Sequence, residues 1–273
     1  MDHKEFNAVL SQKIDLTDRL GIFRIKPDGW RIPHFEPGQF TVLGVPGTHP
    51  VVPHAENVVE QKDPEKMIKR PYSIASSPNN RLYIELYIDL VSEGSLTPRL
   101  FALKVGDRLF MKEKKAGFFT IRDTCPDDAD IVFIATGTGL APFLSYLRTI
   151  DISRQNRNII LFWGCRYSTE LAYHRELLAL QEGNKNFHYR ATISRSHVDP
   201  LPWDGRLGRV DQFWGDGTVE RFLGYRPNAE TNCHFYLCGS MPMIKEWSER
   251  LIQLGMEEHQ PKSPGKIHFE SYY

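Results

Sequence analysis

The run from Arg70 to Ser76 brings a fixed cation, an aromatic ring and a hydroxyl group within a few positions of one another. Tyr72 and Ile74 stand at alternate positions, which favours an extended strand whose side chains alternate between two faces. Arg70 and Tyr72 then share a face. A guanidinium offers a fork of donors to a phosphate, and a tyrosine offers a flat apolar surface. The run predicts either a strand that binds a ligand with a phosphate and a planar ring, such as FAD, or an ordinary core strand with one surface arginine.

A second candidate phosphate site lies at the run from Gly94 to Thr97, which opens a short helix expected over 96–103. The N-terminal end of a helix attracts anions through its free N–H groups and its positive dipole end. Pro98 stands near the start of this helix, where its missing N–H is tolerated. The run predicts either a site for the pyrophosphate of FAD or a simple capped helix.

A second glycine-containing run, Gly137-Thr138-Gly139, follows an apolar strand expected at 131–135 and precedes a helix expected from about Pro142. A turn of this kind lets backbone N–H groups face a pyrophosphate. Because position 142 is proline, the run does not match the G-x-G-x-x-G fingerprint of dinucleotide-binding domains. It predicts a nucleotide phosphate site, with a tight turn that binds no ligand as the alternative.

Several arginines follow the expected strands of the same half of the chain. Arg166 follows the second strand, Ser194 and Arg195 follow the third, and Arg209 comes some residues later. Ligands bind at the carboxyl ends of parallel strands, and several guanidinium groups there suit the 2′-phosphate that NADP(H) carries and NAD(H) lacks. Arg206 competes with Arg209 for this role, since both follow a glycine. The alternative is a set of solvated surface arginines.

The first half of the chain reads as short strands separated by glycine and proline turns. We expect these strands at 6–14, 20–25, 39–45, 71–76, 82–91 and 107–111. Many short strands with such turns predict a closed antiparallel barrel. The segment 46–69 interrupts them with four prolines and with His49 and His54, and it reads as a long surface loop or a partly ordered excursion of unassigned role.

The character of the sequence changes near Cys125. Apolar strands are expected at 131–135, 159–163, 188–193 and 234–237. Helices are expected from about Pro142, at 169–181 and at 242–255. Apolar strands that alternate with helices predict a parallel sheet covered on both faces. The fold prediction is therefore two domains: an antiparallel β-barrel over 1–125, followed over 126–273 by an α/β domain with a parallel sheet.

Composition excludes several classes of protein. The chain has 273 residues with 34 basic and 34 acidic side chains, so no net charge recruits nucleic acid or an anionic membrane. It has no apolar run near the ~20 residues that span a bilayer, and its first residues do not resemble a signal peptide. Its four cysteines form no C-x-x-C pair, so we expect no metal or iron–sulfur site and a reducing, cytoplasmic setting. Any iron–sulfur partner is then a separate molecule.

Two further runs complete a pattern. Cys238-Gly239 ends the last expected strand, and Glu270-Ser271-Tyr272-Tyr273 closes the sequence. With the three runs above, in this order and spacing, the chain resembles the ferredoxin–NADP⁺ reductases of the compact bacterial type over nearly its whole length. The Ala116–Phe119 run and the closing tyrosines resemble the ferredoxin/flavodoxin reductases more narrowly.

The resemblance implies an enzyme that passes a hydride between C4 of the NADP(H) nicotinamide and N5 of FAD, and single electrons between FAD and ferredoxin or flavodoxin. The residues that it implies for FAD are Arg70, Pro71, Tyr72, Ser73, Ile74, Gly94, Ser95, Leu96, Thr97, Ala116, Gly117, Tyr272 and Tyr273. Those that it implies for NADP(H) are Gly137, Thr138, Gly139, Arg166, Ser194, Arg195, Arg209, Cys238 and Gly239.

The resemblance gives catalytic roles to four residues, Ser73, Cys238, Glu270 and Tyr272. Ser73 would hydrogen-bond near the flavin N5. Cys238 and Glu270 would shape the nicotinamide site. Tyr272 would cover the flavin ring on the side opposite Tyr72, and Tyr273 would stack on the FAD adenine. The tail of the second domain is thus expected to return to the flavin.

The expected partner is an acidic one-electron carrier, and the protein is expected to be a monomer. Basic residues expected at the surface either steer that carrier or form a solvated face: Lys112, Lys114, Lys115 and Arg148. Two other functions are possible for this pattern, an NAD(P)H reductase component for an oxygenase or cytochrome and a non-catalytic flavin subunit that relays electrons. The closing tyrosines disfavour the first, and Cys238-Gly239 with the arginines disfavours the second.

Overall fold

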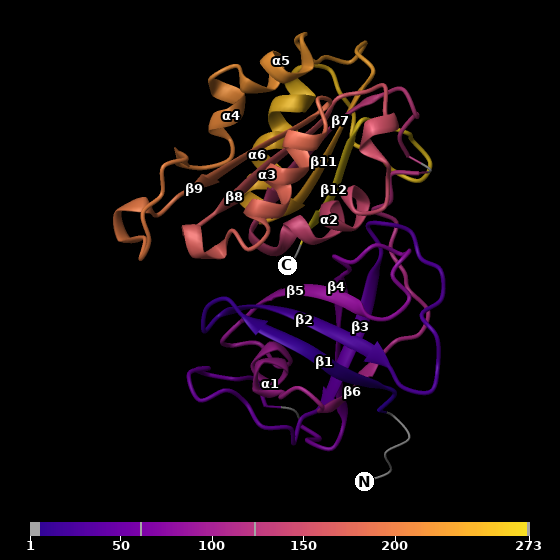
Figure 1. The fold of residues 1–273 in the computed structure, drawn as a ribbon, viewed down its shortest axis with the longest axis vertical. Helices are drawn as coiled ribbons and strands as arrows, with labels where there is room; N and C mark the ends of the chain where they lie inside the picture. Colours follow the sequence, from indigo (N-terminus) through magenta and orange to yellow (C-terminus); the bar gives the residue numbers. More distant parts are fainter. Residues whose placement is uncertain (1–5, 61, 123, 272–273) are drawn as a thin grey trace. The chain divides into compact units, whose positions relative to one another are not determined.

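The computed structural model describes residues 6–60, 62–122 and 124–271. The chain divides into two compact units, and each has its own sheet (Figure 1). The first unit consists of Met1–Phe118 with Ala141–Thr149, and the second consists of Phe119–Leu140 with Ile150–Tyr273. Among the described residues, no helix has the length and apolar character needed to cross a bilayer.

The first unit is built on a six-stranded antiparallel sheet in the order β4-β3-β6-β1-β2-β5. Its strands are β1 (Ala8–Asp15), β2 (Leu20–Pro27), β3 (Phe40–Pro46), β4 (Met67–Ser73), β5 (Ile84–Asp89) and β6 (Arg108–Met111). Alternate residues of β3, namely Thr41, Leu43 and Val45, are fully buried, as expected for a strand with one face on the core. The predicted antiparallel barrel is confirmed.

The segment 46–69 is more than a surface loop. Its last residues, from Met67, already belong to β4, because they pair with the end of β3. Val52 is buried in the barrel core, and its N–H donates to the carbonyl of Pro98 in α1 (Thr97–Ala102) at 3.0 Å. The buried Arg99 donates from Nε and Nη2 to the carbonyl of Gly47, at 3.0 and 2.8 Å. These contacts anchor the segment on α1.

A buried ion pair joins β5 to the residue that follows α2 (Ala141–Leu147). Glu85 is 2% exposed, and its carboxylate accepts from Arg24 Nε and from Arg148 Nη1, both at 2.7 Å. Burial raises the pKa of Glu85, but the two guanidinium groups outweigh it and hold the pKa below its ordinary value. The expectation that Arg148 is a surface charge is therefore wrong, since its guanidinium is occupied by Glu85 and by the Ala75 carbonyl.

We expect Arg148→Ala to lower the free energy of unfolding by about 3 kcal/mol, because it leaves a buried carboxylate with one partner fewer. The pKa of Glu85 is lowered in the folded state, so this loss is present at neutral pH and fades as the pH falls through the carboxyl range. Urea unfolding of the two proteins at pH 7 and pH 4 measures it. Arg154→Ala, which removes an exposed partner of Asp151, is the control and is expected to change stability by less than about 0.5 kcal/mol. Equal stabilities of the Arg148 variant and the parent would contradict the assignment.

The second unit has a six-stranded parallel sheet in the order β10-β9-β8-β7-β11-β12. Its strands are β7 (Asp130–Thr136), β8 (Ile159–Cys165), β9 (Phe187–Ile193), β10 (Arg206–Leu207), β11 (Cys233–Gly239) and β12 (Ile267–Ser271). Its helices are α3 (His174–Gly183), α4 (Gln212–Gly215), α5 (Thr218–Leu223) and α6 (Met241–Gln253), with short 3₁₀ turns at Gly137–Leu140, Ile152–Arg154, Ser168–Glu170 and Ser196–Val198. The predicted parallel-sheet α/β domain is confirmed.

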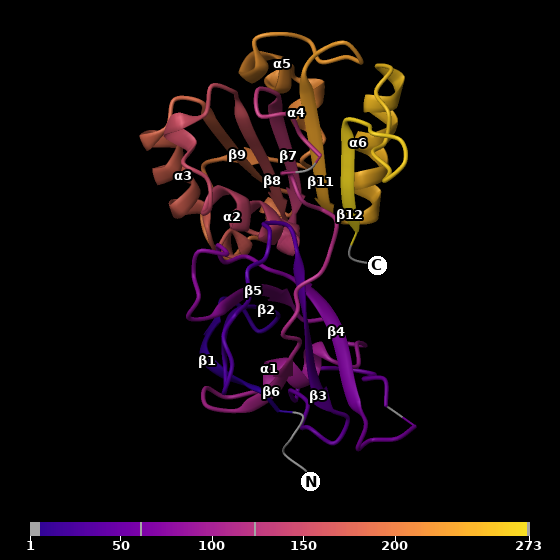
Figure 2. The same ribbon diagram turned by 90° about the vertical axis from the view of Figure 1, so that its right-hand side faces the viewer.

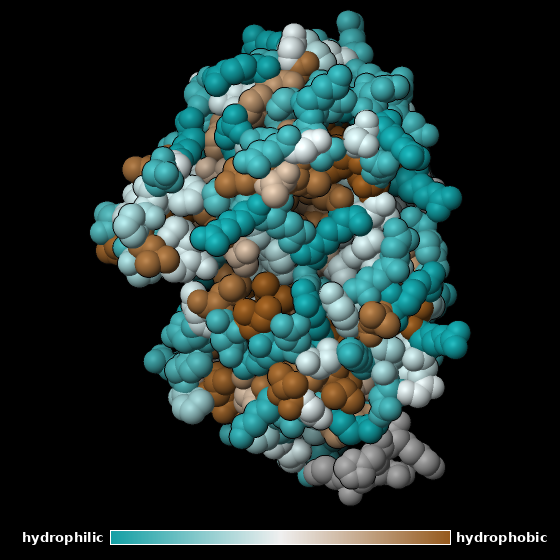
Figure 3. Space-filling model, viewed as in Figure 1, coloured by the Kyte–Doolittle hydropathy of each residue, from teal (hydrophilic) through white to brown (hydrophobic). Residues whose placement is uncertain are grey.

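The strands of this sheet are buried on both faces, which explains why they read as continuous apolar runs. Val132, Ile134 and Phe162 pack with residues of α4, α5 and α6 on one face, and α3 lies on the other (Figure 2). Polar and charged side chains cover much of the surface seen in Figure 3, with apolar side chains in smaller groups between them.

Candidate functional site

Arg70 on β4 lies beside the turn that opens α1. Its Nη2 donates to Ser95 Oγ at 3.2 Å, and its Nη1 donates to the carbonyl of Lys69 at 2.9 Å. The turn itself is held by Thr97, whose hydroxyl accepts from the Val91 N–H at 3.0 Å. Two motifs that are far apart in the sequence are thus brought together, a guanidinium and a serine hydroxyl at the start of a helix.

The other residues predicted for FAD lie around β3. The β3–β4 register places Ser73 opposite Phe40, and Ala116 bridges Phe40 from the other side, with the Phe40 N–H 2.7 Å from the Ala116 carbonyl oxygen. Gln39 Nε2 donates to the carbonyl of Gly117 at 3.4 Å. Ser73 and the Ala116–Gly117 backbone are therefore neighbours across β3.

The observed arrangement fits a flavin nucleotide. Arg70 and Ser95 supply donors for a phosphate, and the half-buried ring of Tyr72 supplies a planar surface. The side chains of Ile74 and Leu96 are buried, so these two residues can reach a ligand only through their backbones. Pro71 is exposed on β4, and Gly94 lies in the turn before α1. Tyr272 and Tyr273 lie outside the described residues.

In the second unit, the turn after β7 packs against the end of β11. A β-carbon at Gly139 would lie 2.6 Å from the carbonyl carbon of Cys238, so only glycine permits this approach. Gly239 has φ +135°, and a β-carbon there would lie 2.8 Å from the Thr136 carbonyl oxygen. Thr136 Oγ1 also accepts from the Ser240 N–H at 2.8 Å. The predicted Gly137–Gly139 and Cys238–Gly239 motifs are therefore brought into backbone contact.

Glu270 lies in β12, which pairs in parallel with β11, and the register places Glu270 next to Cys238. Cys238 is fully buried. The predicted pair of residues for the nicotinamide site is thus brought together by the sheet. Sequence reasoning missed β12 and treated these residues as a tail.

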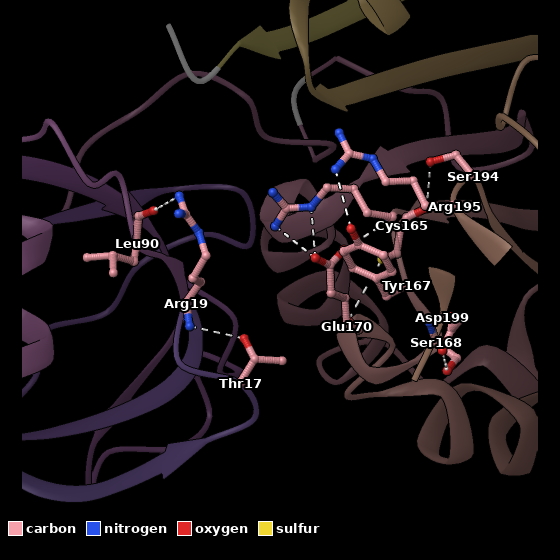
Figure 4. Close-up of polar contacts among 11 residues, drawn as sticks. Thr17, Arg19, Leu90, Cys165, Tyr167, Ser168, Glu170, Ser194, Arg195 and Asp199 are labelled. Carbon is pink, nitrogen blue, oxygen red and sulfur yellow. Dashed lines mark hydrogen bonds and ion pairs between the residues drawn. The ribbon is translucent and has the colours of Figure 1, made fainter. Parts of the chain in front are cut away.

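The loops after β8 and β9 meet at the same end of the sheet (Figure 4). Arg166 pairs with Glu170, with Nε and Nη2 both 2.8 Å from Glu170 Oε1. Ser194 donates its N–H to the Cys165 carbonyl at 3.0 Å. The exposed Arg195 lies with Nη1 3.4 Å from the hydroxyl of Tyr167. The structure therefore gathers Arg166, Ser194 and Arg195 as predicted.

Three residues at this end of the sheet were missed from the sequence. Glu170 fixes Arg166, and Asp199 joins the two loops by accepting from the Ser168 N–H at 2.6 Å and from its hydroxyl at 2.7 Å. Tyr167 contacts Arg195. The spacing of Arg166 and Glu170 by four residues was a readable signal for the first pair. Asp199 gave no such signal, because its partner lies in a different loop.

An open depression of about 530 Å³ in the second unit is lined from Ser196, the residue after Arg195 in the sequence. Its lining includes Ser196, Leu201, Trp203 and Leu207. The depression therefore combines an aromatic ring and apolar side chains with the polar side chains of His197 and Asp199.

Arg206 and Arg209 have different surroundings. Arg206 on β10 forms an ion pair with Asp216, and its guanidinium carbon lies 5.0 Å from the centre of the Phe213 ring. Arg209 follows Gly208, whose N–H donates to the Ile193 carbonyl at 2.8 Å, so it stands next to the end of β9. Its Nε is 3.0 Å from Asp211 Oδ1, and its Nη2 is 3.4 Å from Glu246 Oε2. The side chain of Arg209 is nevertheless the more exposed of the two, 57% against 35%, which favours Arg209 for contact with a phosphate at this end of the sheet.

We expect Arg209→Ala to raise the KM for NADPH about tenfold and Arg206→Ala to change it by less than about twofold, since each charge-assisted phosphate contact contributes about 1.5 kcal/mol. Arg206→Ala is instead expected to lower the melting temperature, because it breaks the pair with Asp216. Steady-state kinetics and thermal melts of both variants measure this. A larger KM effect for Arg206 than for Arg209 would reverse the assignment.

The side chain of Lys115 does not lie at the surface as expected. It was expected at the surface, but it is 5% exposed, and burial lowers the pKa of its amine to about 8. Lys112 and Lys114, its neighbours in sequence, are exposed. The expectation of a surface charge is wrong for Lys115, because the antiparallel bridge between Ala116 and Phe40 turns this side chain toward the buried Thr41.

Comparison with known proteins first shows the class of protein to which the chain belongs. Residues 36–118 match the family model described as oxidoreductase FAD-binding domain, and residues 133–249 match the one described as oxidoreductase NAD-binding domain. The fold is therefore that of a two-domain oxidoreductase with FAD-binding and NAD-binding domains.

Individual relatives define the family. The chain is 30% identical over 241 residues to the flavodoxin/ferredoxin–NADP reductase of Buchnera aphidicola subsp. Baizongia pistaciae, covering 88% of each chain. It is 32% identical over 212 residues to the enzyme of the same name from Shigella flexneri, covering 78% of this chain and 77% of that one. A ferredoxin NADP⁺ reductase from Neisseria gonorrhoeae, solved with bound FAD and NADP, has the same fold, with a TM-score of 0.79 at 24% identity and 98% and 99% coverage. The chain belongs to the flavodoxin/ferredoxin–NADP reductase family.

Proposed function

We propose that this protein is an FAD-dependent reductase that exchanges a hydride between NADP(H) and flavin, and single electrons between flavin and a ferredoxin or flavodoxin. The observation that carries the proposal is the packing of Gly139 against Cys238 and Gly239, beside Glu270 on β12. These four residues, predicted for one nucleotide site, come from β11, β12 and the turn after β7, and they lie together at one end of the sheet. The relatives from Buchnera aphidicola and Shigella flexneri are both named as reductases of flavodoxin and ferredoxin.

In the first unit, Arg70 and the turn from Gly94 to Thr97 would bind the pyrophosphate of FAD, and Tyr72 would pack on the flavin ring. Ser73 would donate a hydrogen bond near the flavin N5. Bound FAD supplies the redox chemistry, because it accepts a hydride from a nicotinamide and releases electrons one at a time. The protein orients the rings and excludes water from them.

In the second unit, Gly137 to Gly139 would bind the pyrophosphate of NADP(H), and Cys238 with Glu270 would shape the nicotinamide site. Arg166, Ser194 and Arg195 would bind the 2′-phosphate. Glu170 holds the Arg166 side chain in a fixed position for this contact. Tyr272 and Tyr273 keep the roles that the family resemblance implies, on the flavin ring and on the adenine.

The partner is proposed to be an acidic one-electron carrier. The exposed Lys112 and Lys114 remain candidates to steer it. Lys115 and Arg148 do not, because Lys115 is buried and Arg148 is paired with Glu85. The protein is proposed to act as a monomer in the cytoplasm, which size-exclusion chromatography with light scattering tests for the oligomeric state.

Cofactor analysis tests the proposal first. The purified protein is expected to be yellow and to release one non-covalent FAD per chain on denaturation. Its flavin is expected to be reduced faster by NADPH than by NADH under anaerobic conditions. Recovery of FMN, no uptake of FAD on reconstitution, or equal rates with both nucleotides would contradict the proposal.

A further inference from the structure

Lys115 presents a buried amine that the proposed function does not use. Its Nζ donates to the Lys112 carbonyl at 2.7 Å and to Thr41 Oγ1 at 3.1 Å, and it lies 5.1 Å from the centre of the Trp30 ring. In the part of the chain that the structure describes, no carboxylate lies within ion-pair distance of it. Lys115 therefore places a positive charge inside the barrel without an ion-paired carboxylate among the described residues.

The strand register brings this charge close to the proposed flavin site. The antiparallel bridge between Phe40 and Ala116 places Thr41 opposite Lys115, and the β3–β4 register places Thr41 opposite Tyr72. Directly opposite residues of antiparallel strands present their side chains on the same face. Lys115, Thr41 and Tyr72 thus form one row across the barrel, and the backbones at its two ends are two strand spacings apart, about 10 Å.

Burial of this charge is unfavourable for folding, because an ammonium group loses its hydration there. Burial is the main reason for the lowered pKa of Lys115, and Glu113 on the same turn opposes it. From the other packed elements, Thr41 and Trp30 bring no ionisable group. An apolar side chain of similar length would fill the space without this penalty. A destabilising charge beside a predicted ligand site indicates a functional role.

We propose that the buried ammonium of Lys115 favours the reduced state of the flavin bound against Tyr72, and so raises the flavin reduction potential. Hydride transfer moves two electrons and one proton from NADPH to FAD, which yields NADP⁺ and a flavin with one more negative charge. A nearby fixed cation is attracted to this added charge and stabilises the product. The inference rests on the proposed binding of FAD.

The midpoint potential of the bound flavin at pH 7 tests the inference. Lys115→Met removes the charge and retains the length of the side chain, whereas Lys115→Arg retains the charge. We expect Lys115→Met to shift the ratio of reduced to oxidised flavin at least tenfold toward the oxidised form, about 30 mV for a two-electron couple. Lys115→Arg and the control Lys114→Met, which removes the neighbouring exposed charge, are expected to stay at the parent potential.

The pH profile separates a charge effect from a structural one. The amine of Lys115 loses its proton as the pH rises through its lowered pKa of about 8, so the gap between parent and Lys115→Met is expected to be constant at lower pH and to close above this range. Lys115→Gln, a second uncharged variant, must show the same shift if Lys115→Met does not fold. Uncharged variants with the parent potential, or a gap that does not close with pH, would overturn the inference.

Two further readouts keep this result distinct from a failure of the proposed function. The FAD dissociation constant of each variant shows whether the cofactor is bound at all. The melting temperature of apo Lys115→Met is expected to equal or exceed that of the parent, because the buried charge is gone. A parent protein without FAD overturns the proposed function, whereas bound FAD with unchanged potentials overturns only the role of Lys115.

Discussion

Replacement of Arg195 by alanine is expected to raise the KM for NADPH about 10- to 100-fold and to leave turnover with NADH near the parent value, since only NADPH carries the 2′-phosphate. Arg195 is exposed, and its guanidinium lies with Nη1 3.4 Å from the hydroxyl of Tyr167. Its guanidinium donors are therefore available to a ligand. The neighbouring Arg166 is less available, because Glu170 accepts two of its donors. We expect a smaller effect from Arg166→Ala.

Steady-state kinetics with both nucleotides measure the effect of Arg195. The control is Arg175→Ala, which removes an exposed arginine from α3 of the same unit and is expected to leave both KM values unchanged. An equal loss with NADPH and NADH would show that Arg195 supports the fold of the loop and does not read the phosphate.

Arg70→Ala is expected to weaken FAD binding about 10- to 100-fold, because a charge-assisted phosphate contact contributes about 1.5–3 kcal/mol. Arg70 is held in place from two sides, by the Lys69 carbonyl and by Ser95 Oγ. Arg70→Lys retains the charge but loses the planar fork, so an intermediate affinity is expected. Titration of the apoprotein with FAD, followed by quenching of flavin fluorescence, gives the dissociation constants.

Arg31→Ala serves as the matched control in this titration, since Arg31 is an exposed arginine of the same unit. It is expected to bind FAD as the parent does. An Arg70→Ala protein that retains the parent affinity would show that the turn before α1 does not bind the pyrophosphate.

The regular elements were largely readable from the sequence, because the apolar strands of the second unit are continuous and the strands of the first are separated by glycine and proline turns. Four of the helices and strands were missed for physical reasons. β10 has only two residues. α4 and α5 are very short, and β12 has only five residues and becomes recognisable as a strand only through its pairing with β11. The pairing matters for the site, since it is what brings Glu270 next to Cys238.

Most residues of the candidate site could be predicted from the sequence. Which of the charged side chains are buried could not. Lys115 and Arg148 read as surface residues because most lysines and arginines are exposed. The partner of Arg148 is Glu85, which lies far earlier in the sequence, and the position of Lys115 follows from a bridge between Ala116 and Phe40. Strand register of this kind depends on the folded barrel, and no local pattern encodes it.

A two-step anaerobic mixing experiment follows the electrons from NADPH through the flavin to a carrier protein. The purified protein with its FAD is first mixed with NADPH, and oxidised ferredoxin or flavodoxin from the same cell is then added while the flavin absorbance is followed. We expect NADPH to bleach the flavin. The carrier is then expected to restore the flavin absorbance in one-electron steps as the carrier becomes reduced. A flavin that NADPH does not bleach, or a reduced flavin that passes no electrons to either carrier, would contradict the proposed function.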